Sequence, residues 1–264
     1  MMPLMVFTDL DGTLLDHETY SWEPAGRALE TLRSLEVPVI PVSSKTIAEI
    51  AVLARRIGLR GPLIGENGNV IGLPREDGSG WKTQVVGTPY LTLRSHLAAA
   101  QAAGFPAKGF GDMTPETIAS LTGLDREAAA LARQRQASEP LCWEGSDKDW
   151  PAFVDFLNRR GLRLQRGGRF WTLSGLTDKG DAVRHLIARH REQLSGEAVV
   201  SIALGDSPND IPMLNAVDHP VLVAPAHSAD MALPENPQLL VTRSSGPAGW
   251  QWAIDHLLDK LGWS

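Results

Sequence analysis

The sequence predicts an α/β protein, with a parallel sheet flanked by helices and a second domain of α+β type inserted between its two halves. The sheet is predicted by apolar runs over residues 6–8 and 199–204, which have the pattern of buried strands and each lead directly into an acidic loop. Open α/β sheets bind ligands beyond the carboxyl ends of their strands, so the two loops are the first candidates for a functional site. The second domain is predicted by the alternation of short helix-like and strand-like segments that begins near Trp81.

Length and composition are those of an ordinary globular protein, and 264 residues are enough to enclose a core. The formal net charge of -6 argues against nucleic acid or an anionic membrane as the main partner, because either would favour a basic surface. No apolar run approaches the roughly 20 residues that span a bilayer, and the amino terminus lacks the pattern of a signal peptide. With Cys142 as the only cysteine, the sequence predicts a cytoplasmic protein without an intrachain disulfide, and it leaves the oligomeric state open.

The first half of the core is predicted to alternate helices and strands. A helix begins at Pro24, with apolar residues at helical spacing after it. Strands are predicted over residues 37–42 and 62–64, and the helix between them starts with a capping box formed by Thr46 and Glu49. Because proline removes a hydrogen-bond donor from a sheet, we expect the first of these strands, which contains two prolines, to be bulged or irregular.

The inserted domain is predicted from three helical segments and three short strands. Glycines close two of the helices, which is typical of helix carboxyl ends. The predicted helices cover residues 91–103, 125–136 and 149–160, and the predicted strands cover residues 140–143, 162–165 and 170–173.

The carboxyl-terminal part of the chain returns to the pattern of the first half. An amphipathic helix is predicted after Lys179, and the strand over residues 199–204 follows it. Two shorter strands are predicted over residues 220–224 and 239–242, and a helix over residues 250–261 closes the chain.

Asp9 and Asp11 follow the first strand with one residue between them, and Gly12 comes directly after. Ionisation of two carboxylates this close together costs free energy unless a cation or a proton lies between them. Mg²⁺ is a hard ion that binds carboxylate, water and phosphate oxygens, so the pattern favours a Mg²⁺ site. For these residues taken alone, an ordinary Asp/Gly turn after a strand is the alternative.

Two further polar segments follow predicted strands. Ser43, Ser44 and Lys45 precede the helix that opens at Thr46, and hydroxyl and amine groups at a helix amino terminus can seat a phosphate. A polar helix cap without a ligand is the alternative here. The other segment is the second acidic loop, Gly205-Asp206-Ser207-Pro208-Asn209-Asp210.

Taken together and in this order, these segments resemble the four motifs of the haloacid dehalogenase superfamily of phosphotransferases. The matching residues are Asp9-Leu10-Asp11-Gly12-Thr13 for the first motif, Ser43 for the second, Lys179 for the third and Gly205-Asp206-Ser207-Pro208-Asn209-Asp210 for the fourth. The resemblance covers the whole chain. It implies a Rossmann-like, doubly wound parallel-sheet core over residues 1–84 and 175–264, with an α/β cap domain over residues 85–174.

The resemblance also implies how the acidic residues act. Asp9 is the nucleophile that forms an aspartyl phosphate, and Asp11 is the general acid and base. Mg²⁺ is held by the Asp9 carboxylate, the main-chain oxygen of Asp11 and Asp206, with Asp210 close by or acting through water. Lys179 joins Asp9 and Asp11 as a catalytic residue.

Phosphate and substrate binding are implied for a second group of residues. They are Ser43, Ser44, Lys45, Asn209 and Arg169, together with Lys179. Lys45 and Arg169 are candidates to neutralise a substrate carboxylate. Trp171 is a candidate to face a sugar, and the alternative for Trp143, Trp150 and Trp171 is a place in the core of the cap.

The function implied is a Mg²⁺-dependent phosphatase of a small phosphorylated sugar or glycoside. Segments that resemble such a phosphatase among the capped members are Ser43-Ser44-Lys45-Thr46, Glu66-Asn67-Gly68, Gly167-Gly168-Arg169-Phe170-Trp171 and Gly246-Pro247-Ala248-Gly249-Trp250. A broad sugar-phosphate phosphatase or a phosphomutase on the same scaffold is the alternative within this class. A non-catalytic sensor of phosphorylated ligands is the alternative outside it, and the presence of both Asp9 and Asp11 argues against it.

Overall fold

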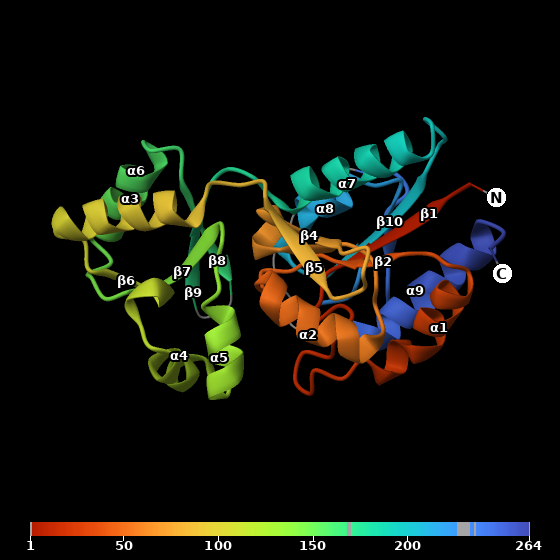
Figure 1. The fold of residues 1–264 in the computed structure, drawn as a ribbon, viewed down its shortest axis with the longest axis horizontal. Helices are drawn as coiled ribbons and strands as arrows, with labels where there is room; N and C mark the ends of the chain where they lie inside the picture. The colour runs from red at the N-terminus through yellow and green to blue at the C-terminus, as the bar shows by residue number, and fades with distance from the viewer. Residues whose placement is uncertain (1, 168–169, 226–232, 235, 264) are drawn as a thin grey trace. The chain divides into compact units, whose positions relative to one another are not determined.

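The computed structural model describes residues 2–167, 170–225, 233–234 and 236–263, and the chain divides into two compact units. The first unit comprises Met1–Ser43, Ala54–Ile64 and Asp178–Ser264, and the second comprises Ser44–Leu53 and Gly65–Thr177. Figure 1 shows the elements of each unit along the chain. Within the described part of the chain, no helix combines the length and the apolar character that crossing a bilayer requires.

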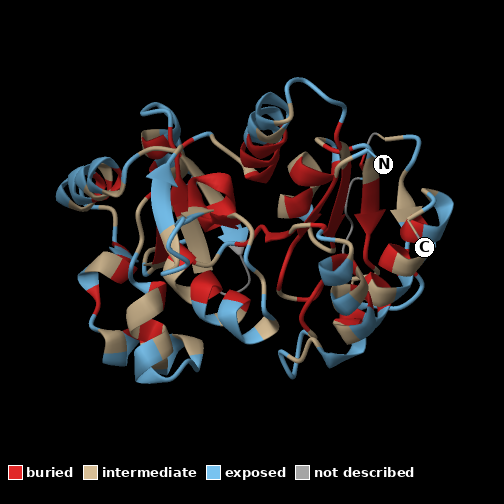
Figure 2. Ribbon diagram, turned by 45° about the vertical axis from the view of Figure 1, so that its right-hand side comes forward, coloured by how far each residue is buried: buried red, intermediate tan, exposed pale blue. Residues whose placement is uncertain are grey.

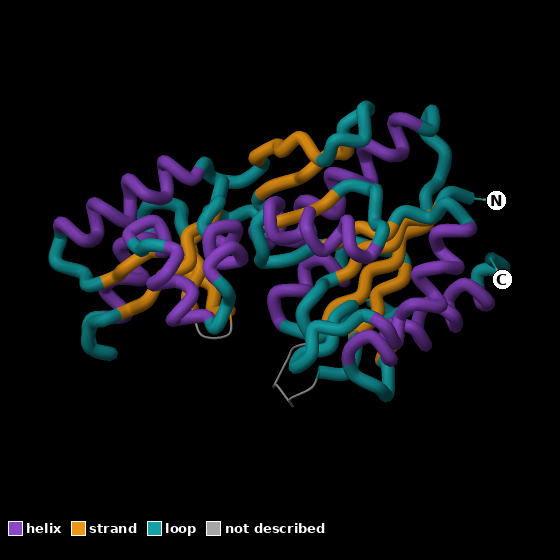
Figure 3. Tube along the Cα trace, turned by 60° about the horizontal axis from the view of Figure 1, so that its bottom comes forward, coloured by secondary structure: helices purple, strands orange, loops and turns teal. Residues whose placement is uncertain are grey.

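A five-stranded parallel sheet forms the centre of the first unit, so the α/β prediction is confirmed. Its strands, in spatial order, are β12 (Leu240–Val241), β11 (His219–Leu222), β10 (Val200–Gly205), β1 (Leu4–Thr8) and β2 (Val39–Pro41). All five residues of β1 are buried, as are five of the six in β10, which is why the sequences of these strands are almost entirely apolar. The strands lie side by side in Figure 3, and the buried colour follows them in Figure 2.

Helices cover both faces of this sheet, which makes it doubly wound. Figure 1 shows α7 (Lys179–Gln193) and α8 (Ile211–Leu214) on one face, and α1 (Gly26–Ser34) and α9 (Gly246–Lys260) on the other. The helix predicted from Pro24 begins as a 3₁₀ turn over Glu23–Ala25 before it continues as α1.

Strand β2 is shorter than predicted and is not bulged against its neighbour. Its three residues pair with β1 in continuous register, so the expectation of a bulge within residues 39–41 was wrong. The reason is the alternation of donors along a strand. The nitrogen of Val42 donates to the Thr8 carbonyl at 2.7 Å, so the nitrogen of Pro41, one residue earlier, points to the other side, where β1 needs no donor.

The second unit contains an antiparallel four-stranded sheet with helices packed against it, which matches the predicted α+β character. Its strand order is β6 (Ala107–Gly109), β7 (Ser138–Trp143), β9 (Phe170–Ser174) and β8 (Arg163–Gly167). Its helices are α3 (Tyr90–Ala102), α4 (Pro115–Thr122), α5 (Arg126–Ala132) and α6 (Trp150–Asn158). The division into units falls within helix α2 (Ile47–Ile57), after Leu53, and within β3 (Leu63–Gly65), after Ile64. Strand β3 forms a small sheet with β4 (Val70–Pro74) and β5 (Trp81–Val85), which both belong to the second unit.

Helices α4 and α5 differ from the prediction. Helix α4 was missed, although Thr114 caps its amino end and Gly123 ends it in the left-handed conformation. Helix α5 stops at Ala132 instead of continuing to residue 136. The backbone nitrogens of Gln136 and Ala137 donate to the Glu66 carboxylate, so a tertiary contact takes the place of the hydrogen bonds that a further helical turn would give them.

Three tryptophans of the second unit pack against its hydrophobic core. Trp143, Trp150 and Trp171 are partly buried beside a cluster that includes Phe153 and Leu157. The rings of Trp143 and Phe153 stack with centroids 5.0 Å apart, and those of Trp150 and Trp171 lie 4.5 Å apart. The core interpretation of these tryptophans is therefore confirmed, and contact with a sugar is not needed to explain them.

Candidate active site

Strands β1 and β10 bring the two acidic loops to one edge of the sheet. They pair in parallel with Thr8 opposite Leu204, and the Asp9 nitrogen donates to the Leu204 carbonyl at 2.9 Å. Because both strands end at the same level, Asp9 and Asp206 leave the sheet side by side. The apolar runs of the sequence therefore place these two carboxylates together, although 197 positions separate them.

Gly12 lets the first loop pass close to the second. Its φ of +83° lies in the left-handed region, and a Cβ there would collide with the Asp206 carboxylate. The loop then closes through the Gly12 nitrogen, which donates to the Leu15 carbonyl at 2.9 Å. Glycine is required here for its backbone conformation and for the space that the acidic side chain occupies.

Substitution of Gly12 by alanine is expected to disturb both the fold and the site. Left-handed strain costs about 1 to 3 kcal/mol of unfolding free energy, and the added methyl group also displaces Asp206. Gly78→Ala is a matched control, because Gly78 has a φ of +69° but a Cβ added there would have no atom within 4 Å. Urea unfolding should show a loss of stability in both variants. Phosphate release should show a loss of activity only in Gly12→Ala. Full activity in Gly12→Ala would contradict the close approach.

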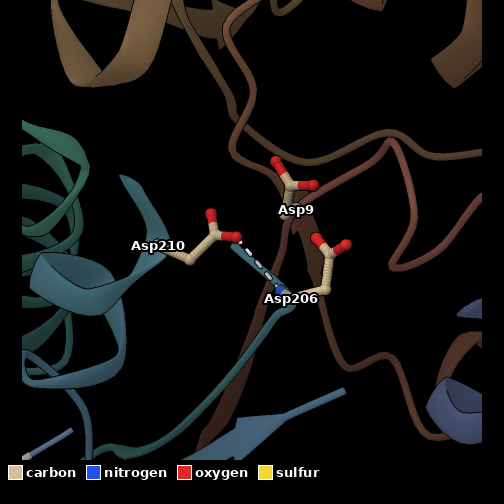
Figure 4. Close-up of side chains that lie close together, drawn as sticks. All are labelled: Asp9, Asp206 and Asp210. Atoms are coloured by element: carbon tan, nitrogen blue, oxygen red, sulfur yellow. Dashed lines mark hydrogen bonds between the residues drawn. The ribbon is translucent and has the colours of Figure 1, made fainter. Parts of the chain in front are cut away.

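Asp9, Asp206 and Asp210 form a compact cluster of carboxylates. One oxygen from each lies within 4.8 Å of the others, and Figure 4 shows the three groups facing one another. Thr13 Oγ1 donates to Asp206 Oδ1 at 3.1 Å, while Asp210 Oδ2 accepts from the backbone nitrogens of Asp206 and Ser207 at 3.1 and 3.0 Å. Hard oxygen ligands fixed at this spacing fit a divalent cation such as Mg²⁺.

Lys179 is the cation that the structure places in this cluster. Its Nζ atom lies 2.6 Å from Asp9 Oδ1 and 2.6 Å from Asp210 Oδ1, and the residue is 1% exposed. Lys179 is the first residue of α7, whose start is fixed by a capping box between Asp178 and Asp181. The helix cap therefore sets where the amine enters the site.

Burial and charge shift the pKa values of three of these groups. Burial, with the neighbouring Asp210 and Asp11 charges, raises the pKa of Asp9 well above its ordinary value despite the opposing effect of Lys179. Burial and the Asp210 charge raise the pKa of Asp206 to about 6. Burial alone would lower the pKa of Lys179, but the Asp210 and Asp9 carboxylates outweigh it and raise that pKa. The site therefore has more negative charge than one lysine neutralises, and an additional cation would stabilise it.

The other residues predicted for the core site lie on the same edge of the first unit. Asp11 is half-buried in the loop after β1. Ser43 is 1% exposed just after β2, and its nitrogen donates to the Ile64 carbonyl at 3.0 Å. Asn209 lies in a 3₁₀ turn over Pro208–Asp210, where its Oδ1 accepts from Ser207 Oγ at 2.5 Å.

The remaining predicted residues belong to the second unit. Ser44 is exposed and Lys45 is half-buried, and both precede α2. Arg169 lies outside the described residues. The structure thus brings together Asp9, Asp206, Asp210 and Lys179 by direct contacts, and it groups Ser44 and Lys45 with a different compact unit.

Two supporting contacts were not predicted. Trp250 is fully buried, and its Nε1 donates to Thr8 Oγ1 at 3.0 Å; the Thr8 hydroxyl in turn donates to the Asp9 carbonyl at 2.7 Å. Ser207 Oγ also lies 2.9 Å from Asp210 Oδ2, so its single hydroxyl proton is shared between this carboxylate and Asn209 Oδ1. The glycine-rich segment before Trp250 was a signal that this helix matters, but the partner of its indole is 242 positions away in the sequence.

Known proteins resemble this chain in sequence. The sequence matches the family of haloacid dehalogenase-like hydrolases over residues 6–84 and 173–231. It is 38% identical to a glucosyl-3-phosphoglycerate/mannosyl-3-phosphoglycerate phosphatase of Methanococcoides burtonii, with 98% of each chain covered.

Two solved structures share the fold. BT1666 of Bacteroides thetaiotaomicron, a phosphatase of the haloalkanoate enzyme superfamily, has a TM-score of 0.70 at 20% identity, with 97% of this chain and 95% of that chain covered. The sucrose-phosphatase of Synechocystis has a TM-score of 0.61 at 17% identity, with 97% and 98% covered. At these identities the likeness concerns the fold.

Proposed function

The chain belongs to the haloacid dehalogenase-like hydrolase family and is a phosphatase, and from this premise we propose that it hydrolyses mannosyl-3-phosphoglycerate to mannosylglycerate and phosphate. The observation that carries the reaction type is the contact of Lys179 with Asp9 beside Asp206 and Asp210. The substrate is supported by the activity for which the 38% identical relative is named and by the sequence segments around Lys45 and Arg169.

In the first step, an Asp9 carboxylate oxygen attacks phosphorus and the bond from phosphorus to the substrate's ester oxygen breaks. Asp11 donates a proton to the departing alkoxide, so the alcohol leaves neutral and an aspartyl phosphate remains. In the second step, Asp11 takes a proton from water as the water oxygen attacks phosphorus. The bond between phosphorus and Asp9 breaks, which releases inorganic phosphate and restores the free Asp9 carboxylate.

Lys179 and the proposed Mg²⁺ would both balance the negative charge of the site carboxylates and of the phosphoryl group. The carboxylates of Asp9, Asp206 and Asp210, whose oxygens lie within 4.8 Å of one another, would hold the ion. The motif resemblance adds the main-chain oxygen of Asp11 to these ligands. When bound, the ion neutralises charge on the transferring phosphoryl group and orients it for in-line attack. The Lys179 ammonium supplies a second positive charge and reaches the nucleophile at 2.6 Å, so it holds the Asp9 carboxylate in one orientation.

The size of the barrier requires several residues to act together. Enzymes accelerate phosphate-monoester hydrolysis by up to about 10²¹-fold. One positioned donor supplies about 10² to 10³ and one acid-base group about 10² to 10⁴. We therefore propose that Ser43 and Asn209 complete the phosphate site on the first unit. We also propose that the substrate is selected by the cap over residues 85–174, which includes Arg169, together with Ser44 and Lys45.

The experiment that tests this function is a phosphate-release screen of the purified protein with Mg²⁺. Its substrates are mannosyl-3-phosphoglycerate, glucosyl-3-phosphoglycerate, 3-phosphoglycerate and a set of simple sugar phosphates. We expect the highest kcat/KM for the mannosyl compound. A flat profile would reject the substrate assignment and favour a broad phosphatase, whereas transfer between hydroxyls of one sugar without phosphate release would indicate a mutase.

Removal of divalent cations is expected to abolish turnover and to lower thermal stability. Dialysis against a chelator leaves the carboxylate cluster balanced by Lys179 alone, and restored Mg²⁺ stabilises the folded state by about 2.7 kcal/mol at a concentration 100 times its Kd. The measurement is Tm with and without Mg²⁺ alongside phosphate release. In Asp206→Asn the Mg²⁺-dependent rise in Tm should shrink. A chelated enzyme with full activity would rule out the proposed cation.

A further inference from the structure

A buried hydrogen-bond network in the second unit joins the loop before α2 to the segment between α5 and β7. Its first member is Glu66, which is 1% exposed in the loop after β3. The Glu66 carboxylate accepts from the backbone nitrogens of Gln136 and Ala137 at 2.8 and 2.9 Å and from Ser138 Oγ at 2.7 Å. A carboxylate with three donors has a defined position, so the loop that holds Glu66 is fixed to residues 136–138.

Arg135 is the second member of the network. Its Nε donates to the Ala132 carbonyl at 2.8 Å, and its NH1 nitrogen donates to the Ser44 carbonyl at 2.8 Å. The NH2 nitrogen lies 3.8 Å from the Glu49 carboxylate, and the side chain is 8% exposed. The guanidinium is therefore occupied by protein acceptors on several sides, and it ties the end of α5 to the loop that precedes α2.

The two members hold the backbone on both sides of Lys45. Arg135 binds the carbonyl of Ser44, and the backbone nitrogen of Glu66 donates to the carbonyl of Lys45 at 2.8 Å. Because a peptide group is planar, each carbonyl contact also sets the direction of the following N–H group. The next residue, Thr46, is anchored as well, since its Oγ1 donates to the Leu131 carbonyl at 3.0 Å.

We propose that Arg135 is a positioning residue that holds Lys45 in the orientation in which it binds the anionic part of a phosphorylated substrate. This rests on the proposed function, in which Lys45 is a substrate-binding residue. Arg135 acts through the Ser44 carbonyl and not by touching the substrate. The division into units supports this role, because Ser43 belongs to the first unit whereas Ser44 and Lys45 belong with Arg135 to the second.

The proposal predicts that Arg135 and Lys45 affect substrate binding as one element. Arg135→Lys keeps the positive charge but loses the planar fork that reaches two carbonyls at once. We expect it to raise KM about ten-fold, as the loss of a charge-assisted hydrogen bond does, and to change kcat less than about three-fold. Arg160→Lys is a matched control in the same unit, because Arg160 also donates to a backbone carbonyl, that of Phe156, at 2.7 Å. It should leave KM unchanged.

A double-mutant cycle separates positioning from general damage to the fold. In a Lys45→Met background, Arg135→Lys should raise KM by less than about two-fold, because the side chain that it positions is gone. An undiminished ten-fold effect in that background would overturn the proposal, as would an unchanged KM in Arg135→Lys alone. Tm of each variant shows whether it is folded at the assay temperature.

Amide hydrogen exchange provides a readout that does not depend on turnover. In the wild type without substrate, the amides of Lys45 and Thr46 should exchange at least about ten-fold more slowly than in Arg135→Lys, while those of β1 stay equal in both. Equal exchange at Lys45 and Thr46 would overturn the anchoring role of Arg135. A wild-type enzyme that releases phosphate from none of the screened substrates would reject the proposed function instead, and the exchange data would still decide whether Arg135 anchors the loop.

Discussion

Asp9→Asn is expected to reduce kcat by at least about 10⁴-fold, because an amide does not replace a carboxylate as the nucleophile toward phosphorus. The structure holds Asp9 in a defined position within the site. It directly follows the buried strand β1, its carbonyl is held by Thr8 and its carboxylate contacts Lys179 at 2.6 Å. The measurement is phosphate release at saturating substrate with Mg²⁺.

A rapid-quench experiment extends this test to the covalent step. Phosphorus-labelled substrate should leave label on the wild-type protein, at Asp9, and none on Asp9→Asn. The control is Asp77→Asn, because Asp77 lies in an exposed turn and its carboxylate accepts from the Ser79 nitrogen. This control should keep wild-type turnover. Substantial activity in Asp9→Asn would assign the nucleophile to another residue.

Lys179→Met is expected to damage both catalysis and stability. The variant leaves the buried Asp9 and Asp210 carboxylates without the ammonium that lies 2.6 Å from each. Removal of one partner from a buried ion pair costs about 3 to 5 kcal/mol of unfolding free energy. We also expect kcat to fall by about 10² to 10³, the usual effect of losing one donor at the transition state.

Urea unfolding at neutral pH checks the stability of this variant, and Mg²⁺ should restore part of it by balancing the same carboxylates. The control is Lys148→Met, because Lys148 is exposed on the second unit and should change neither property. If Lys179→Met proved as stable as the wild type without Mg²⁺, the proposed balance of charge between Lys179 and these carboxylates would be wrong.

The candidate site was predictable in the first unit because its residues follow from strand ends. The runs before Asp9 and Gly205 are short, apolar and followed by glycine-containing acidic loops, so local pattern alone places the loops beyond the strands. Parallel pairing then brings strand ends to one edge. Lys179 was identified from its motif resemblance. Its distance from Asp9 does not follow from the spacing in the sequence, because Lys179 lies on a separate element, at the first turn of α7.

The misplaced elements share a cause. Helix α5 does not extend to residue 136, where the nitrogens of Gln136 and Ala137 bind Glu66 instead of helical carbonyls. Strand β2 keeps a continuous register because its proline nitrogen points away from β1. In both cases tertiary packing decides, because Glu66 is distant from α5 in the chain and the side of β2 that meets β1 is set only when the two strands pair.

By itself, the sequence determined the α/β class, the strands that end at the site, the acidic loops and the residue types available for phosphate chemistry. These follow from the periodicity of buried residues and from the turn chemistry of glycine and aspartate, which are local properties. Only the tertiary structure decided that Lys179 bridges Asp9 and Asp210, that Trp250 supports Thr8 and that Arg135 anchors Ser44. These contacts depend on the distances between side chains of separate elements, which are set when the elements pack.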